Sequence, residues 1–149
     1  MSIHRELMDD ALKAQLVPAL LQRGFTGSLP HFRRRLADRI DFAMVQFSRS
    51  GGRFTLEVGQ TGPEGLKDPS WPDLDVSKTT VAHLRHRARV ARGFWRKQWF
   101  KFGPRVYDRP KPAKPAAFYE AIARDALKAF QSDGEAWLAR RPALAEPGP

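Results

Sequence analysis

The sequence predicts an α+β fold with an N-terminal helix, an antiparallel sheet of about four strands and a C-terminal helix packed on the sheet. Residues 3–23 and 115–130 carry apolar residues at three- and four-residue spacing, which is typical of amphipathic helices. Between them, residues 31–60 hold three segments rich in strand-forming residues, and a Gly-Gly pair separates the last two. A chain of 149 residues fits one domain, which we expect to span residues 1–141.

The first helix is expected to contain a break. Pro18 lies inside the apolar pattern, so it should kink the helix or open a second short helical turn after Val17. Gly24 can adopt the left-handed conformation that ends a helix, and Phe25 can then fold back onto the last turn.

Three strands should follow. Residues 31–36 form a short one, and residues 39–49 are apolar on both faces, which predicts an inner strand covered on two sides. Ser50-Gly51-Gly52 indicates a tight turn, because glycine tolerates the positive φ that hairpins require. Residues 54–60 then alternate, with Phe54 facing inward and Thr55 and Glu57 outward.

The next two segments are opposite in charge. Residues 62–78 contain prolines, glycines and four acids, which predicts a long loop that can pack against the basic segment behind it. Residues 81–91 alternate at period two, which predicts a strand with Arg85, Arg87 and Arg89 on one face; a helix starting at Thr80 is the alternative. Residues 93–102 form another strand or an aromatic-rich turn, and residues 103–115 an extended connector.

The C-terminal helix should begin at Pro115, because proline is well tolerated at the first helical position. Ser132-Asp-Gly-Glu135 matches a capping box and predicts the start of a short final helix that contains Trp137. We expect residues 142–149 to form a disordered, proline-rich tail.

Composition excludes several classes of protein. Without cysteine the chain has no disulfide, no thiolate nucleophile and no cysteine-bearing zinc site. The N-terminus does not resemble a signal peptide, and no apolar run approaches membrane-spanning length. We therefore expect a cytoplasmic, bacterial protein with no membrane partner.

The basic charge is concentrated in one segment. Residues 81–115 contain eleven lysines and arginines against one acid, Asp108, and account for the net charge of +10. Six aromatic residues are interleaved with these cations. Such a segment can hold a polyanion by charge and stack against it, or it can be a solvated sheet edge and loop.

Several short motifs resemble one bacterial family. They are Leu20-Leu21-Gln22-Arg23-Gly24-Phe25, Phe32-Arg33-Arg34, Val45-Gln46-Phe47, Gly51-Gly52-Arg53-Phe54-Thr55, Val58-Gly59, His83-Leu84-Arg85-His86-Arg87 and Gly93-Phe94-Trp95. Over roughly residues 5–130 the chain is similar to the family catalogued as domain of unknown function 4304. The resemblance implies a small α+β domain with flanking helices and an antiparallel sheet, and it implies no activity.

Two constellations could support metal chemistry. His83 and His86 would share one face of a helix, but a strand would separate them and no third ligand is near, so we expect no metal site. Asp41 and Glu57, on successive strands, resemble the carboxylates that hold magnesium in nucleases. The lysine usual two residues after the second carboxylate is replaced by Gly59, so this constellation is incomplete.

The sequence therefore favours a non-enzymatic binding domain without catalytic residues or cofactors. Its expected partner is an anionic macromolecule, either an acidic protein or a nucleic acid. By analogy with toxin-neutralising proteins, the domain would bind the acidic protein and mask its surface. A metal-dependent nuclease that uses Asp41 and Glu57 is a further alternative, and the sequence leaves the oligomeric state open. The expected partner-binding residues are Arg33, Arg35, Arg85, Arg87, Arg89, Trp95, Arg96 and Trp99.

Overall fold

A computed structural model describes residues 2–140 and confirms the α+β class. The helices are α1 (Ile3–Gln15), α2 (Val17–Gln22), α3 (Ala116–Ala129) and α4 (Glu135–Ala139), with short 3-10 turns η1 (Val76–Lys78) and η2 (Val81–His83) and a π-helical turn η3 (Phe130–Gly134). The strands are β1 (Thr26–Ser28), β2 (His31–Arg35), β3 (Ile40–Phe47), β4 (Arg53–Thr61), β5 (Arg87–Arg89) and β6 (Phe100–Lys101). Among these residues, no helix is both long enough and apolar enough to cross a membrane.

The strands form one antiparallel sheet in the order β1-β2-β3-β4-β5, and β6 also pairs with β4. The sheet therefore has six strands where about four were expected. The two additional strands are very short: β1 has three residues and β6 has two. The expected hairpin between β3 and β4 is confirmed, and Phe47 lies opposite Phe54 in its register.

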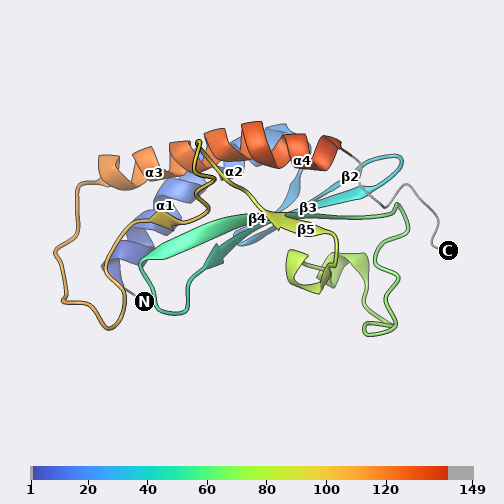
Figure 1. Ribbon diagram of the computed structural model, residues 1–149, viewed down its shortest axis with the longest axis horizontal. Coiled ribbons are helices and arrows are strands. Elements are labelled where there is room, and N and C mark those ends of the chain that lie inside the picture. The colour runs from blue at the N-terminus through green and yellow to red at the C-terminus, as the bar shows by residue number, and fades with distance from the viewer. Residues whose placement is uncertain (1, 141–149) are drawn as a thin grey trace.

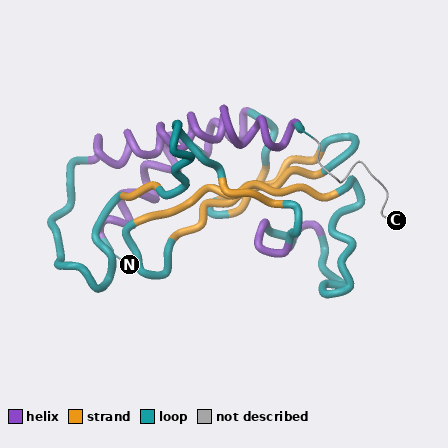
Figure 2. The backbone as a smooth tube through the Cα atoms, in the orientation of Figure 1, coloured by secondary structure: helices purple, strands orange, loops and turns teal. Residues whose placement is uncertain are grey.

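The helices cover one face of the sheet (Figures 1 and 2). Helix α1 ends at Gln15 and α2 begins at Val17, so Pro18 opens a second helix as predicted. The main core fills the space between helices and sheet, where Leu12, Phe54 and Tyr119 are fully buried.

The segment that joins β4 to β5 runs along the opposite face of the sheet (Figure 2). This face has its own apolar cluster. Ile40, Phe42 and Met44 of β3 contact Val81 and Leu84 there. Strand β3 is therefore buried on both faces, which confirms the inner strand predicted from its sequence.

The strand predicted over residues 81–91 is wrong for most of its length. Residues 81–83 form η2, and β5 contains Arg87–Arg89 alone. A 3-10 turn places residues three apart on one side, so Val81 and Leu84 can both enter the second apolar cluster. The imidazole Nδ1 of His83 accepts the Thr80 N–H at 3.0 Å, which satisfies the start of the turn.

The capping box at Ser132 is also wrong. The chain passes from α3 through η3 into α4 without leaving helical conformation. The Ser132 hydroxyl donates to the Lys128 carbonyl at 3.0 Å, so it does not cap a new helix. Gly134 allows this continuous path, because a Cβ there would lie 3.1 Å from Phe130 and 3.3 Å from Val90. The expected tail, residues 142–149, lies outside the described residues.

A buried ion-pair network ties the last helix to the sheet. Arg34 of β2 donates through Nη2 to Asp41 Oδ2 and to Glu135 Oε1, each at 2.7 Å. Arg39 donates to Asp41 Oδ1 at 2.8 Å, and Asp41 is fully buried. Burial alone would raise the pKa of Glu135, but hydrogen bonds and charge from Arg34 and then Arg23 hold that pKa below its ordinary value.

Candidate binding surface at the β5–β6 edge of the sheet

The structure separates the eight expected partner-binding residues into three groups. Arg87, Arg89 and Trp99 lie on or beside β5 and β6, and Trp95 and Arg96 lie in the segment that joins these strands. Arg33 and Arg35 lie on β2, and strands β3 and β4 separate them from β5. Arg85 ends the long segment after β4, so the five arginines do not form one continuous row.

Two of the three predicted arginines outside this edge, Arg33 and Arg85, have direct partners in the fold. Arg33 donates through Nη1 to the Val76 carbonyl at 2.8 Å and so holds η1 against β2. Arg85 pairs with Asp68 at 3.1 Å while its side chain stays 82% exposed. The Ser70 backbone N–H, and then Arg85, hold the pKa of Asp68 below its ordinary value. The acidic loop therefore pairs with one of the predicted arginines.

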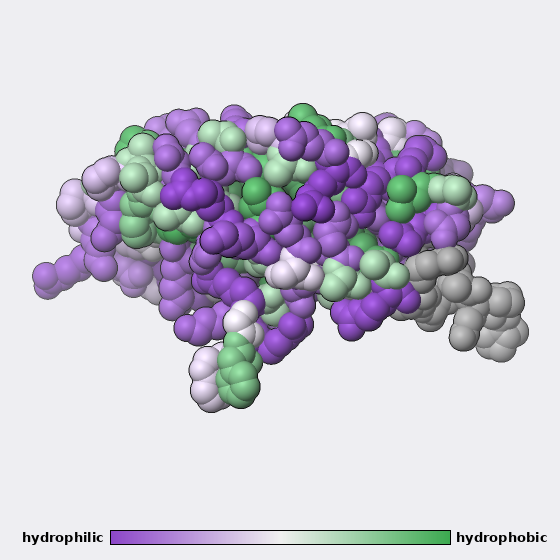
Figure 3. All heavy atoms as spheres, turned by 90° about the horizontal axis from the view of Figure 1, so that it is seen from above, coloured by the Kyte–Doolittle hydropathy of each residue, from purple (hydrophilic) through white to green (hydrophobic). Residues whose placement is uncertain are grey.

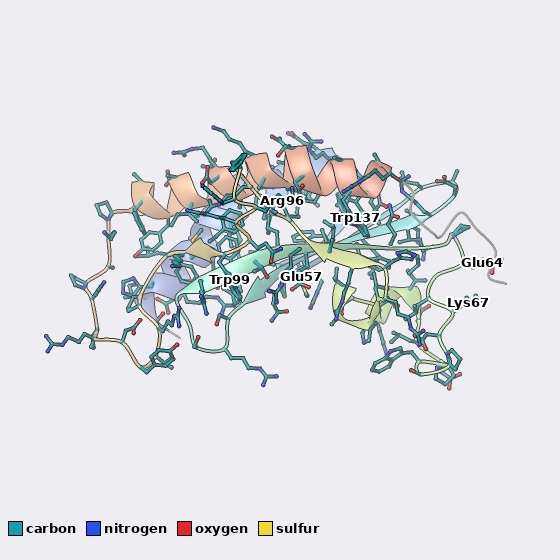
Figure 4. The ribbon with its side chains drawn as sticks, in the orientation of Figure 1. Glu57, Glu64, Lys67, Arg96, Trp99 and Trp137 are labelled. Atoms are coloured by element: carbon teal, nitrogen blue, oxygen red, sulfur yellow. The ribbon has the colours of Figure 1, made fainter. Side chains whose placement is uncertain are left out.

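Two guanidinium groups lie over the ring of Trp99. The Cζ atoms of Arg53 and Arg89 lie over its ring, 4.4 Å and 5.3 Å from the ring centroid. Thr55, expected to face outward, does point away from the helices but is fully buried. Figure 4 shows Trp99 and Glu57 on the side of the sheet opposite α3. This face of β4, β5 and β6 is the arginine–tryptophan face, formed by Arg53, Arg87, Arg89, Trp99 and Lys101.

Glu57 lies on the arginine–tryptophan face, opposite Arg89 in the β4–β5 register, but it forms no ion pair with the four cations there. Within residues 2–140, none of them has a carboxylate oxygen within ion-pair distance. Arg87 instead donates to the Val81 and Ala82 carbonyls, each at 3.3 Å. The face is thus a positively charged surface with one aromatic ring held in it.

Residues 92–97 form a tight turn between β5 and β6, here called the aromatic tip. Arg92 and Lys97 exchange backbone hydrogen bonds, each 2.9 Å long. The turn is closed by positive φ angles at Gly93 (73°) and Arg96 (53°), the second of which is uncommon for a residue with a side chain. Phe94 is 88% exposed and Trp95 is 79% exposed, and their rings meet edge to face at 5.1 Å.

Ion pairs fix the base of the aromatic tip to the C-terminal helices. Asp133 of η3 accepts from the Ala91 N–H and from Arg96 Nη1, both at 2.8 Å. Asp125 of α3 accepts from Arg92 Nη1 at 2.6 Å. Arg96 accordingly lies beside α3 in Figure 4. The tip is an apolar pair with charged residues around its base.

Large exposed apolar groups are otherwise dispersed. Seen from the side of the helices, the surface is mostly hydrophilic, with hydrophobic side chains in small separate patches and one group projecting from the body (Figure 3). All four tryptophans lie in the described chain, and none of them is fully buried.

Asp41 and Glu57 do not form a shared site. Asp41 pairs in register with Gln60, and Glu57 with Met44, so the two carboxylates point to opposite faces of the sheet. Asp41 is held by Arg34 and Arg39 in the buried network. In residues 2–140 no group of three histidine, aspartate or glutamate side chains is placed to hold a metal ion.

Arg53, Lys101 and Phe94 belong to this surface, although they were not among the residues predicted to bind a partner. Arg53 precedes the alternating pattern of β4, and it reaches Trp99 because β6 pairs with the start of β4. Phe94 adjoins Trp95 directly after Gly93, so a glycine before two aromatic residues was the available signal.

Fold and surface together define a small α+β domain with a basic, aromatic sheet edge. Residues 16–108 match the model of the family described as "Domain of unknown function (DUF4304)", and the chain belongs to this family. The match is narrower than the resemblance over residues 5–130, and it contains all six strands and the aromatic tip. Neither the curated proteins nor the solved structures include a match to the chain.

Proposed function

We propose that this protein is a non-enzymatic binding domain that docks an acidic partner protein through the aromatic tip and the arginine–tryptophan face. The observation that carries the proposal is the exposed Phe94–Trp95 pair on a rigid, charged base. An exposed apolar patch bordered by polar groups is typical of a protein interaction site.

The aromatic tip is suited to act as an anchor. Full burial of two large apolar side chains contributes roughly 3–6 kcal/mol before the costs of association. Tryptophan is enriched among the residues that dominate interface energies. The ion pairs from Asp125 and Asp133 restrict the tip beforehand, so binding loses less conformational entropy.

The arginine–tryptophan face supplies the electrostatic part of the proposal. Arg53, Arg87, Arg89 and Lys101 add positive potential around Trp99 without a paired acid in the described chain. Clustered charge of one sign raises the association rate of an oppositely charged protein and selects against basic ones. An acidic surface with an apolar pocket is the complement of this edge.

Nucleic acid is the second candidate, and the exposure of the Trp95 ring beside Arg96 favours it. Bases stack on exposed aromatic rings in many single-strand binding proteins. Trp99 is less suitable for stacking, because the Arg53 and Arg89 guanidinium groups already lie over its ring. Affinity for nucleic acid would fall with salt at a slope of roughly −0.9 per phosphate neutralised on duplexes.

The test is photo-crosslinking in cells of the source organism, with the crosslinker placed at residue 97. We expect an acidic polypeptide to be captured by the parent protein, with its yield reduced at least tenfold in Phe94→Ser/Trp95→Ser. Leu21→Ser is the matched control, because Leu21 is an exposed apolar residue on α2 outside this surface. Equal capture by all three proteins would refute the proposal.

Binding to duplex DNA and to poly(dT) at increasing salt is the companion experiment. The acidic-protein proposal predicts weak retention that does not depend on Phe94 and Trp95. Tight, salt-sensitive retention that is lost in the double variant would favour the nucleic-acid candidate instead.

A further inference from the structure

A groove lined by both polar and apolar residues lies at the other edge of the sheet, between the β1–β2 hairpin and η1. Its volume is about 480 Å³, and the described residues that line it include no aspartate or glutamate. It lies on the β2 side of the sheet, with β3 and β4 between it and β5. An inference about this groove is therefore independent of the proposed function.

Arg33 gives the groove a fixed cation. It is half-buried on β2, and its Nη1 donates to the Val76 carbonyl at 2.8 Å, which holds the guanidinium beside η1. A guanidinium has five N–H donors in a planar fork, so this bond leaves others for a ligand. Because the fork matches two oxygens of a phosphate group, a fixed arginine is well suited to bind one.

Two further basic groups line the same groove. His31 lies two residues before Arg33 on β2, so both side chains point to the same face of the sheet. Lys78 lines it from η1, together with the hydroxyl-bearing residues Ser77 and Thr80. The lining thus combines cations with hydroxyl groups, the donor set used for phosphate oxygens.

The local electrostatics favour an anion. Burial, and then the charge of His83, lowers the pKa of His31. Arg33 and Lys78 add positive charge from β2 and η1. Asp75 precedes η1, and its carboxylate accepts from Ser77 while its charge interacts with Arg35.

We propose that this groove binds a small phosphate-bearing molecule, with the phosphate held by Arg33, Lys78 and His31. Pockets for small molecules occupy roughly 300–1,000 Å³, so the groove has room for a phosphorylated metabolite beyond the phosphate group itself. Free phosphate shares the same chemistry and is the simplest probe.

The test is an NMR titration of the four histidines in the full-length protein, in phosphate and in chloride at matched ionic strength. Bound phosphate stabilises the imidazolium, so the His31 midpoint should rise by about 0.5 pH unit or more in phosphate. His4 and His86, which do not line the groove or border His31, are internal controls, for which phosphate and chloride should give the same result.

Variants decide whether the site is specific. Arg33→Gln and, separately, Lys78→Ala should each reduce the phosphate-dependent shift at least twofold, whereas Lys67→Ala, an exposed lysine of the same segment, should not. Lys78→Ala leaves the Arg33–Val76 contact in place, so it separates loss of binding from loss of structure. An equal His31 midpoint in both salts, or an unchanged shift in both groove variants, would overturn the proposal. Phe94→Ser/Trp95→Ser should leave the shift intact, so failure of one proposal is distinguishable from failure of the other.

Discussion

Replacing Asp41 with asparagine should destabilise the fold by about 3–5 kcal/mol, the usual cost of removing one partner of a buried ion pair. Asp41 is fully buried and accepts from Arg34 at 2.7 and 3.1 Å, from Arg39 at 2.8 Å and from Gln60 at 3.3 Å. Arg34 and Arg39 are themselves largely buried, with side chains 12% and 15% exposed. The substitution therefore removes the buried carboxylate that pairs with both arginines, and Arg34 keeps its ion pair with Glu135.

Urea unfolding followed by circular dichroism measures this loss as a lower midpoint at constant slope. Asp10→Asn is the matched control: Asp10 is exposed on α1, and surface substitutions usually change stability by less than about 0.5 kcal/mol. Asp41→Asn combined with Arg34→Met should cost less than the sum of the two single substitutions, because the pair is lost only once. A cost below about 1 kcal/mol for Asp41→Asn would refute the network argument. The same result would favour a functional role for the Asp41 carboxylate over a structural one.

Three further substitutions test other parts of the structure, and Gly62→Ala is the control for one of them. The folded-state pKa of Glu135 is lowered, so its stabilising effect is complete above the unfolded value of about 4.3 and is lost as pH falls through the folded value. Glu135→Gln should therefore flatten the acid limb of a stability–pH curve; an unchanged limb would count against the ion pairs with Arg34. Gly52→Ala should cost about 2 kcal/mol or more in thermal unfolding, because φ is +77° and the new Cβ would lie 2.4 Å from the Gly103 carbonyl oxygen. Gly62→Ala, whose Cβ meets nothing within 4 Å, should be nearly neutral. Ser132→Ala should cost less than about 0.5 kcal/mol, whereas loss of a true N-cap typically costs about 1 kcal/mol; a cost of that size would restore the capping box.

Local sequence signals were sufficient to predict those elements that depend on residues close together in the sequence. The break at Pro18, the positive φ of Gly24 and the β3–β4 hairpin all follow from residues close together in the sequence. The two-faced burial of β3 was likewise visible as an apolar pattern on both faces. These features depend on backbone preferences and periodicity, which a sequence displays directly.

The conformation of the short elements depends on the parts of the fold that pair or pack with them. β5 and β6 have three and two residues, too few for a periodic pattern, and they are strands because β4 offers a free edge. Ser132 carries a strong local capping signal, yet packing of Phe130 and Gly134 keeps the helix continuous. Tertiary packing overrides a local preference worth about 1 kcal/mol.

The sequence by itself determined the fold class, the principal helices and hairpin, and the concentration of positive charge in residues 81–115. Only the tertiary structure decided which of those charges lie together. It places Arg89 with Arg53 around Trp99, and it moves Arg33 to the far edge of the sheet beside a separate groove. The physical reason is that strand order and register arise from pairing between distant segments, whereas charge and periodicity are properties of each segment alone.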